Sequence, residues 1–177
     1  MDQIINKVLE MGAYDAKIIN TSDLRFDSIF RKYCADNKCG FYGNNHMCPP
    51  DVGTVEEVKS KVLQYDKGIY FQTISPINGF SDNENLEKAA FKHNNLANNI
   101  KKYILASGYE KVLPMGTKCR YCPECSKIKG EPCIHPDMAI SCLSAYCIDV
   151  LDMAKKLNME YLLGDKKIAY FGLVLFK

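Results

Sequence analysis

Hydrophobic positions along the chain follow two spacings, one typical of helices and the other of strands. Helical spacing predicts four helices, which begin at Asp2, at the capping boxes Thr54-Val55-Glu56-Glu57 and Ser81-Asp82-Asn83-Glu84, and at Pro136. Extended apolar runs predict strands within residues 16–26, 69–74, 111–115 and 168–176. The last run is apolar at almost every position, which is typical of a central strand covered on both faces.

Helices and strands alternate in this pattern, so it predicts an α/β fold in which helices flank a small mixed sheet of about four strands. An α+β arrangement would fit the same pattern. No repeat, low-complexity tract or linker divides the chain, and we therefore expect one domain over residues 1–177. Two cysteine-rich loops interrupt the pattern, and they are the candidate metal-binding segments.

The composition excludes several classes of function. The 23 basic and 21 acidic residues give a net charge of +2, which provides no electrostatic case for binding nucleic acid or a membrane surface. The N-terminal residues carry no basic segment followed by an apolar core, and no apolar run reaches the roughly 20 residues that span a bilayer. We therefore expect a cytoplasmic protein, in which thiols stay reduced.

Cysteine is the residue type that points to chemistry. Seven of the nine cysteines fall into two groups, and an odd total counts against a complete set of disulfides. Thiolates this close in sequence are usually held together by a metal that they bind. The first group is Cys34, Cys39 and Cys48, and the second is Cys119, Cys122, Cys125 and Cys133.

The second group has the spacing C-x2-C-x2-C, which can place three thiolates at three corners of a [4Fe–4S] cluster. Cys133, with Pro136 shortly after it, would supply the fourth corner, although ferredoxins use a shorter spacing and a proline that follows directly. Zinc is the alternative, with Cys119, Cys122, Cys133 and His135, or Cys125 with Cys133, as tetrahedral ligands. A zinc site leaves the third cysteine of the regular run without a clear role.

The first group supplies only three cysteines, in a loop where Gly40 and Gly43 let the backbone pass close to a cluster. Three thiolates would leave one iron open to a substrate, and so create a place for catalysis. A fourth protein ligand would favour simple electron transfer, and the candidates are His46, Cys142 and Cys147. Alternatively, these cysteines complete one structural metal site together with the second group.

Cys142 and Cys147 both fall in the helix predicted to begin at Pro136. Cys147 lies on its apolar stripe and is expected to be a small buried hydrophobic residue. Cys142 lies off the stripe and is the better candidate for an extra metal ligand. His93 lies on the apolar face of the long predicted helix, which favours a core histidine. His46 and His135 lie two residues from cysteines, where they would donate hydrogen bonds to cluster sulfur.

Three motifs together resemble a family of small prokaryotic predicted metal-binding proteins, domain of unknown function 2284. They are Cys34-x4-Cys39-Gly40-Phe41-Tyr42-Gly43-x4-Cys48-Pro49-Pro50, the run Cys119-x2-Cys122-x2-Cys125 with Cys133-x2-Pro136, and Ile148-Asp149-Val150. The resemblance implies a cytosolic metal-binding protein of anaerobes, of iron–sulfur type, with the seven grouped cysteines as ligands. It supplies no established reaction.

The chain departs from the family pattern after Pro136. Relatives tend to carry a glutamate where this chain has Ser144, and a glycine before Ile-Asp-Val where this chain has Cys147. An acid/base role for that glutamate therefore has no counterpart here. Cys142 and Cys147 are peculiar to this sequence.

Three hypotheses follow. The first is a redox protein with one or two [4Fe–4S] clusters that passes electrons to a partner protein. The second is an enzyme whose open iron acts on a small sulfur- or oxygen-bearing substrate, with catalytic residues that the sequence leaves unassigned. The third is a zinc-stabilised interaction module. The chain has no glycine-rich dinucleotide motif and no P-loop, so we expect no nucleotide cofactor.

Overall fold

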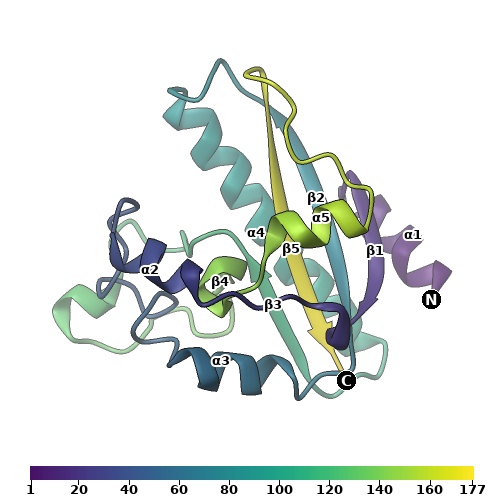
Figure 1. The fold of residues 1–177 in the computed structure, drawn as a ribbon, viewed down its shortest axis with the longest axis horizontal. Helices are drawn as coiled ribbons and strands as arrows, with labels where there is room; N and C mark the ends of the chain where they lie inside the picture. Colours follow the sequence, from purple (N-terminus) through teal and green to yellow (C-terminus); the bar gives the residue numbers. More distant parts are fainter.

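Five strands form one mixed sheet in the computed structural model, which describes residues 1–177 (Figure 1). Their order is β1-β2-β5-β3-β4. All neighbouring pairs are antiparallel except β3 and β4, which are parallel. The bounds are β1 Asp15–Asn20, β2 Lys67–Pro76, β3 Val112–Gly116, β4 Ser141–Cys142 and β5 Lys167–Phe176. The predicted α/β class with a small mixed sheet is confirmed, and the strand that the sequence pattern missed is the two-residue β4.

Helices cover both faces of this sheet. The helices are α1 Asp2–Glu10, α2 Ile29–Ala35, α3 Val55–Val62, α4 Asn83–Ala106 and α5 Val150–Lys156, with short 3-10 segments η1 Thr21–Asp23, η2 Ser126–Lys129 and η3 Leu143–Tyr146. α1 and α4 pack on one face, and α3, η3 and α5 pack on the other. None of the helices is both long enough and apolar enough to cross a membrane.

The strand β5 lies between β2 and β3, at the centre of the sheet, as its continuous apolar sequence predicted. Side chains of a strand alternate between the two faces. Accordingly, Leu173 and Leu175 join the hydrophobic cluster beneath α3 and α5, while Val174 and Phe176 join the cluster beneath α4. The continuous apolar run therefore reflects two separate cores that share one strand.

Two predicted helix starts can be compared with the structure. Thr54 caps α3 as expected: its hydroxyl accepts from the Glu57 amide at 3.2 Å, and the Glu57 carboxylate accepts from the Thr54 amide at 2.7 Å. The predicted box at Ser81 is wrong, because α4 is capped by Asp82, whose carboxylate accepts from the Asn85 amide. Aspartate is as good a cap as serine, and it lies one residue closer to the helix.

The predicted helix from Pro136 is wrong over most of its length, and only α5 is α-helical. Its apolar positions have helical spacing but lie on opposite faces of the sheet: Ile140 packs beneath α4, and Leu143 packs beneath α3 and α5. Cys147 has φ 59°, a left-handed backbone that ends η3 and that glycine adopts most easily. This conformation accounts for the glycine that the family resemblance implies there.

His93 is a buried core residue, as its position on the apolar face of α4 predicted. It is 0% exposed, its Nδ1 lies 2.7 Å from the Thr73 hydroxyl, and its ring stacks on Phe71 with the centroids 4.9 Å apart. Burial lowers the pKa of His93 to about 3. The imidazole is therefore neutral in the folded protein throughout the physiological range.

This low pKa makes stability depend on pH. The unfolded chain takes up a proton at His93 below pH 6.5, whereas the folded protein does so only near pH 3. The contribution of His93 to the free energy of unfolding is therefore complete above pH 6.5. As pH falls below this value, the free energy of unfolding decreases by up to about 1.4 kcal/mol per pH unit because of this residue. Urea unfolding of the wild type and of His93→Gln between pH 7 and 4.5 measures the difference. Equal pH slopes for the two proteins would contradict the prediction.

Candidate metal centre

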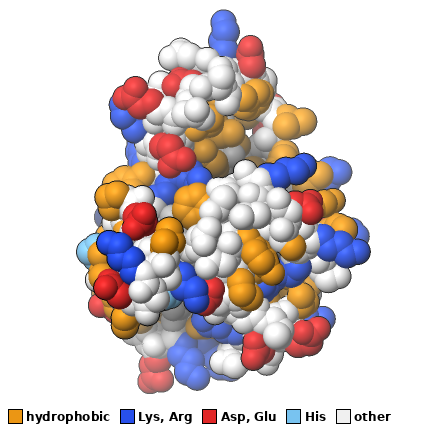
Figure 2. Space-filling model, turned by 90° about the vertical axis from the view of Figure 1, so that its left-hand side faces the viewer, with side chains coloured by type: hydrophobic (Ala, Val, Ile, Leu, Met, Phe, Trp, Pro, Cys, Tyr) orange, Lys and Arg blue, Asp and Glu red, His pale blue; other side chains and the backbone are white.

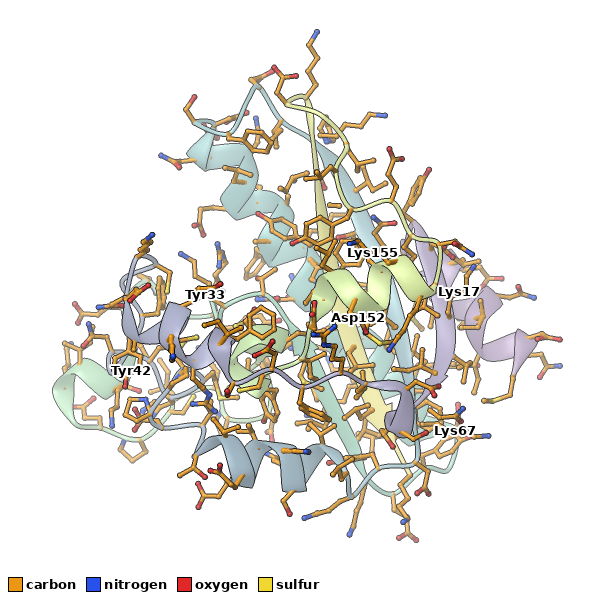
Figure 3. All side chains as sticks on the ribbon, in the orientation of Figure 1. Lys17, Tyr33, Tyr42, Lys67, Asp152 and Lys155 are labelled. Carbon is orange, nitrogen blue, oxygen red and sulfur yellow. The ribbon has the colours of Figure 1, made fainter.

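Two long loops, residues 36–54 and 117–140, carry most of the grouped cysteines and meet at one end of the molecule (Figure 1). Figure 3 shows Tyr33 and Tyr42, which belong to the first cysteine region, at this end, far from both termini. The loops contact each other through His46, whose Nε2 lies 2.9 Å from the Glu131 carbonyl oxygen, and through an ion pair between Lys127 and Asp51. The two cysteine groups are therefore neighbours in space.

The outer face of these loops carries charges of both signs. Figure 2 looks onto this end of the molecule and shows Lys and Arg side chains interspersed with Asp and Glu, with hydrophobic groups between them. Within the loops, Lys118 lies over the Phe41 ring at 4.2 Å from its centroid and joins one loop to the other. Arg120 and Lys118 both pair with Glu87 of α4.

The first cysteine group is assembled from three separate parts of the chain. Cys34 lies in the last turn of α2, a helix that the sequence pattern did not predict, and α2 packs against η3. Cys48 is buried in the loop, and the neighbouring Met47 carbonyl accepts a hydrogen bond from the Ser141 hydroxyl at 2.8 Å. These two contacts bring Cys142, at the end of β4, toward both cysteines. Cys39 is exposed at the rim.

Electrostatic coupling among these thiols shows the same grouping. Burial raises the pKa of the Cys48 thiol to about 12, and repulsion from Cys142, Cys39, Cys34 and, more weakly, Cys119 adds to the effect. Burial also raises the pKa of Cys142 to about 11, with further contributions from Cys34 and Cys39, while the Ala145 amide lowers it. Without a cation, the thiols of Cys34, Cys48 and Cys142 therefore resist ionisation. A metal would reverse this resistance by stabilising the thiolates.

The cysteines of the second group line part of a cavity of about 420 Å³. Burial, followed by repulsion from Cys119, Cys125 and Cys133, raises the pKa of Cys122. His46 and His135 also line this cavity. The structure therefore places His46 beside the second group, and its role as a fourth ligand of the first group stays a prediction. The four predicted ligands that line the cavity are Cys119, Cys122, Cys125 and Cys133.

In neither group do three or more His, Cys, Asp or Glu side chains converge on one point where a single metal ion could bind. Cys147 is 0% exposed and belongs to the core, although it lies close enough to Cys34 to raise the pKa of that thiol. Cys142 thus lies near all three cysteines of the first group, and Cys147 lies near Cys34 within the core.

A row of buried polar side chains on α4 holds the second loop, and the sequence pattern gave no indication of it. The Asn94 carbonyl oxygen accepts from the Thr117 amide at 2.8 Å and from its hydroxyl at 3.0 Å, and the Asn94 amide donates to the Lys118 carbonyl at 3.0 Å. One turn further, the Asn98 amide donates to the Tyr121 hydroxyl and to the Met138 carbonyl. Asparagines four residues apart on a helix share a face, which was the available signal.

Replacing Asn94 by alanine is expected to lower the free energy of unfolding of the metal-loaded protein by about 2–4 kcal/mol, because Thr117 and Lys118 lose a fully buried hydrogen-bond partner. Urea denaturation followed by circular dichroism measures the change. The control is Asn99→Ala, which alters the same residue type on the exposed face of α4 and is expected to change stability by about 0.5 kcal/mol or less. Equal losses in both variants would contradict the anchoring role.

Comparison with known proteins gives one match. The model of a family described as predicted metal-binding protein, DUF2284, matches residues 17–176. This range runs from β1 into the last residue of β5 and includes both cysteine groups. No curated protein and no solved structure matches the chain. The chain belongs to the DUF2284 family of predicted metal-binding proteins.

Proposed function

We propose that this chain is an iron–sulfur protein that binds two [4Fe–4S] clusters and transfers electrons to a partner protein. The observation that supports the proposal is that four cysteines line one cavity of the second loop, while Cys142 lies near the three cysteines of the first group. Four cysteines are the usual ligand number of a [4Fe–4S] cluster, which supplies reversible one-electron transfer when bound. The ligands of the first site would be Cys34, Cys39, Cys48 and Cys142, and those of the second site Cys119, Cys122, Cys125 and Cys133.

Cys142 favours electron transfer over catalysis at an open iron. A set of three cysteines would leave one corner free for a substrate. Cys142 lies near enough to Cys34 and Cys39 for each to raise its pKa, and it would fill that corner. At the second site, a cluster also gives every cysteine of the regular C-x2-C-x2-C run a role. A tetrahedral zinc ion bound by Cys119, Cys122, Cys133 and His135 would leave Cys125 without a ligand role.

The proximity of the two sites supports electron exchange between them. Cys119 of the second set contributes to the raised pKa of Cys48 in the first, and His46 bridges the two loops. Cys39 is exposed, so a partner that docks at this end of the molecule would approach the first site closely. The proposal thus assigns the loop end of the protein as the electron-exchange surface.

Reductive titration under anaerobic conditions, followed by electron paramagnetic resonance, tests the proposal. We expect two reversible one-electron reductions per chain. A further addition of cyanide should leave the spectra unchanged, because no iron would be open to it. Metal that cannot be reduced would overturn the redox role, and a cyanide-dependent signal would favour the open-iron enzyme instead.

A further inference from the structure

Arg31 is a half-buried cation, and two of its guanidinium nitrogens are fully buried. The Nε and Nη2 atoms donate to no acceptor, and the guanidinium forms no ion pair with any carboxylate. A buried N–H of a charged group that has no hydrogen-bond acceptor is unfavourable. The arrangement therefore points to an anion that completes this part of the molecule when the protein is loaded.

The position of Arg31 on α2 identifies that anion. Arg31 precedes Cys34 by three residues, and residues with this spacing share a helix face. The two unpartnered nitrogens of Arg31 therefore lie on the same side of α2 as the Cys34 thiol, which belongs to the first cysteine group. The nearest acidic residue in sequence, Asp27, uses one carboxylate oxygen to accept from the Ile29 amide and does not pair with Arg31.

We infer that Arg31 is the counter-charge and positioning residue for the metal–thiolate group of the first site, an inference that rests on the proposed function. Four cysteine thiols become negatively charged when they bind a metal centre. A guanidinium offers several N–H donors in a fixed plane, which suits contacts to thiolate sulfur or inorganic sulfide. Such a contact stabilises an added electron and would therefore raise the reduction potential of the first site.

This role predicts effects of opposite sign in the empty and the loaded protein. In metal-free protein, Arg31→Met removes a half-buried charge whose Nε and Nη2 have no acceptor, so the urea midpoint should rise. In loaded protein the same change removes a favourable contact. Metal should then leave the first site to a chelator about tenfold faster or more, as expected when one charge-assisted hydrogen bond is lost. The reduction potential of that site should become more negative.

The matched control is Lys32→Met, which removes an equal charge from the next residue, whose side chain is exposed. It should leave the urea midpoint and the chelator rate at wild-type values. Arg31→Gln repeats the comparison if Arg31→Met fails to fold. A variant at Arg31 that destabilises metal-free protein while metal release stays at the wild-type rate would overturn the inference and make Arg31 a packing residue of α2.

The outcome also separates this inference from the proposed function. If the purified protein contains zinc and no labile sulfide, the iron–sulfur proposal fails. A zinc ion with four thiolates is also negatively charged, so zinc release and metal-free stability then decide the role of Arg31 by the same comparison. If clusters are present but Arg31→Met behaves as Lys32→Met does, only the inference fails.

Discussion

Alanine in place of Cys142 is expected to make the first site labile while leaving the second intact. After a brief exposure to a chelator, iron per chain should fall from about eight to about four, as expected when one of two [4Fe–4S] clusters is lost. The reason is that three thiolates leave one corner of the cluster exposed to water and to competing ligands. Iron and acid-labile sulfide measured before and after the chelator give the result.

The matched control for this prediction is Cys147→Gly. Cys147 also lies near Cys34, but it is fully buried in the core and has the left-handed backbone that glycine adopts without strain. This variant should retain wild-type iron through the same treatment. If Cys147→Gly loses iron and Cys142→Ala does not, Cys142 is not the fourth ligand of the first site, and Cys147 takes that role.

Complete removal of metal is expected to unfold both cysteine loops locally while the sheet stays folded. The two hydrophobic clusters take their buried residues from outside residues 34–53 and 117–139, so little apolar burial holds the loops in place. In metal-free protein, the loop segments that Asn94 and Asn98 do not hold should open at a cost of about 0 kcal/mol, whereas the core strands should open only near the global unfolding free energy. Hydrogen exchange of the loaded and metal-free forms measures both quantities.

Hydrogen-exchange protection of the strands shows whether the unfolding is local. Amides of β2 and β5, at the centre of the sheet, should remain protected in both forms. If their protection disappears together with that of the loops, the metal stabilises the whole domain, and the division between a self-sufficient sheet and metal-dependent loops is wrong. If the loops remain protected without metal, hydrogen bonds such as those of Asn94 are sufficient to hold them.

The sequence predicted elements well where one local signal decided the structure. The capping box at Thr54 and the apolar run of β5 are examples, because each depends on residues adjacent in the chain. The helix expected from Pro136 failed because Ile140 and Leu143 have helical spacing yet pack on opposite faces of the sheet. Periodicity records which residues are buried, and it does not record which face buries them.

The same difference between local and long-range signals applies to the candidate metal centre. The second cysteine set lies within one short segment, so its spacing alone brought its members together. Cys142 comes near the first group because β4 pairs with β3 and Ser141 bonds to the distant Met47 carbonyl, and sequence spacing carries no information about such pairing. His46, only two residues from Cys48, contacts the other loop instead. The sequence therefore identified Cys142 as a candidate and favoured it over Cys147, but it could not show which contacts bring Cys142 near the first group.

The most direct measurement is the metal and sulfide content of protein expressed and purified without oxygen, together with its visible spectrum. The account predicts about eight irons and eight acid-labile sulfides per chain, with broad brown absorbance. One or two zinc ions per chain with no labile sulfide would contradict it, and the cysteine loops would then be structural elements of a binding module.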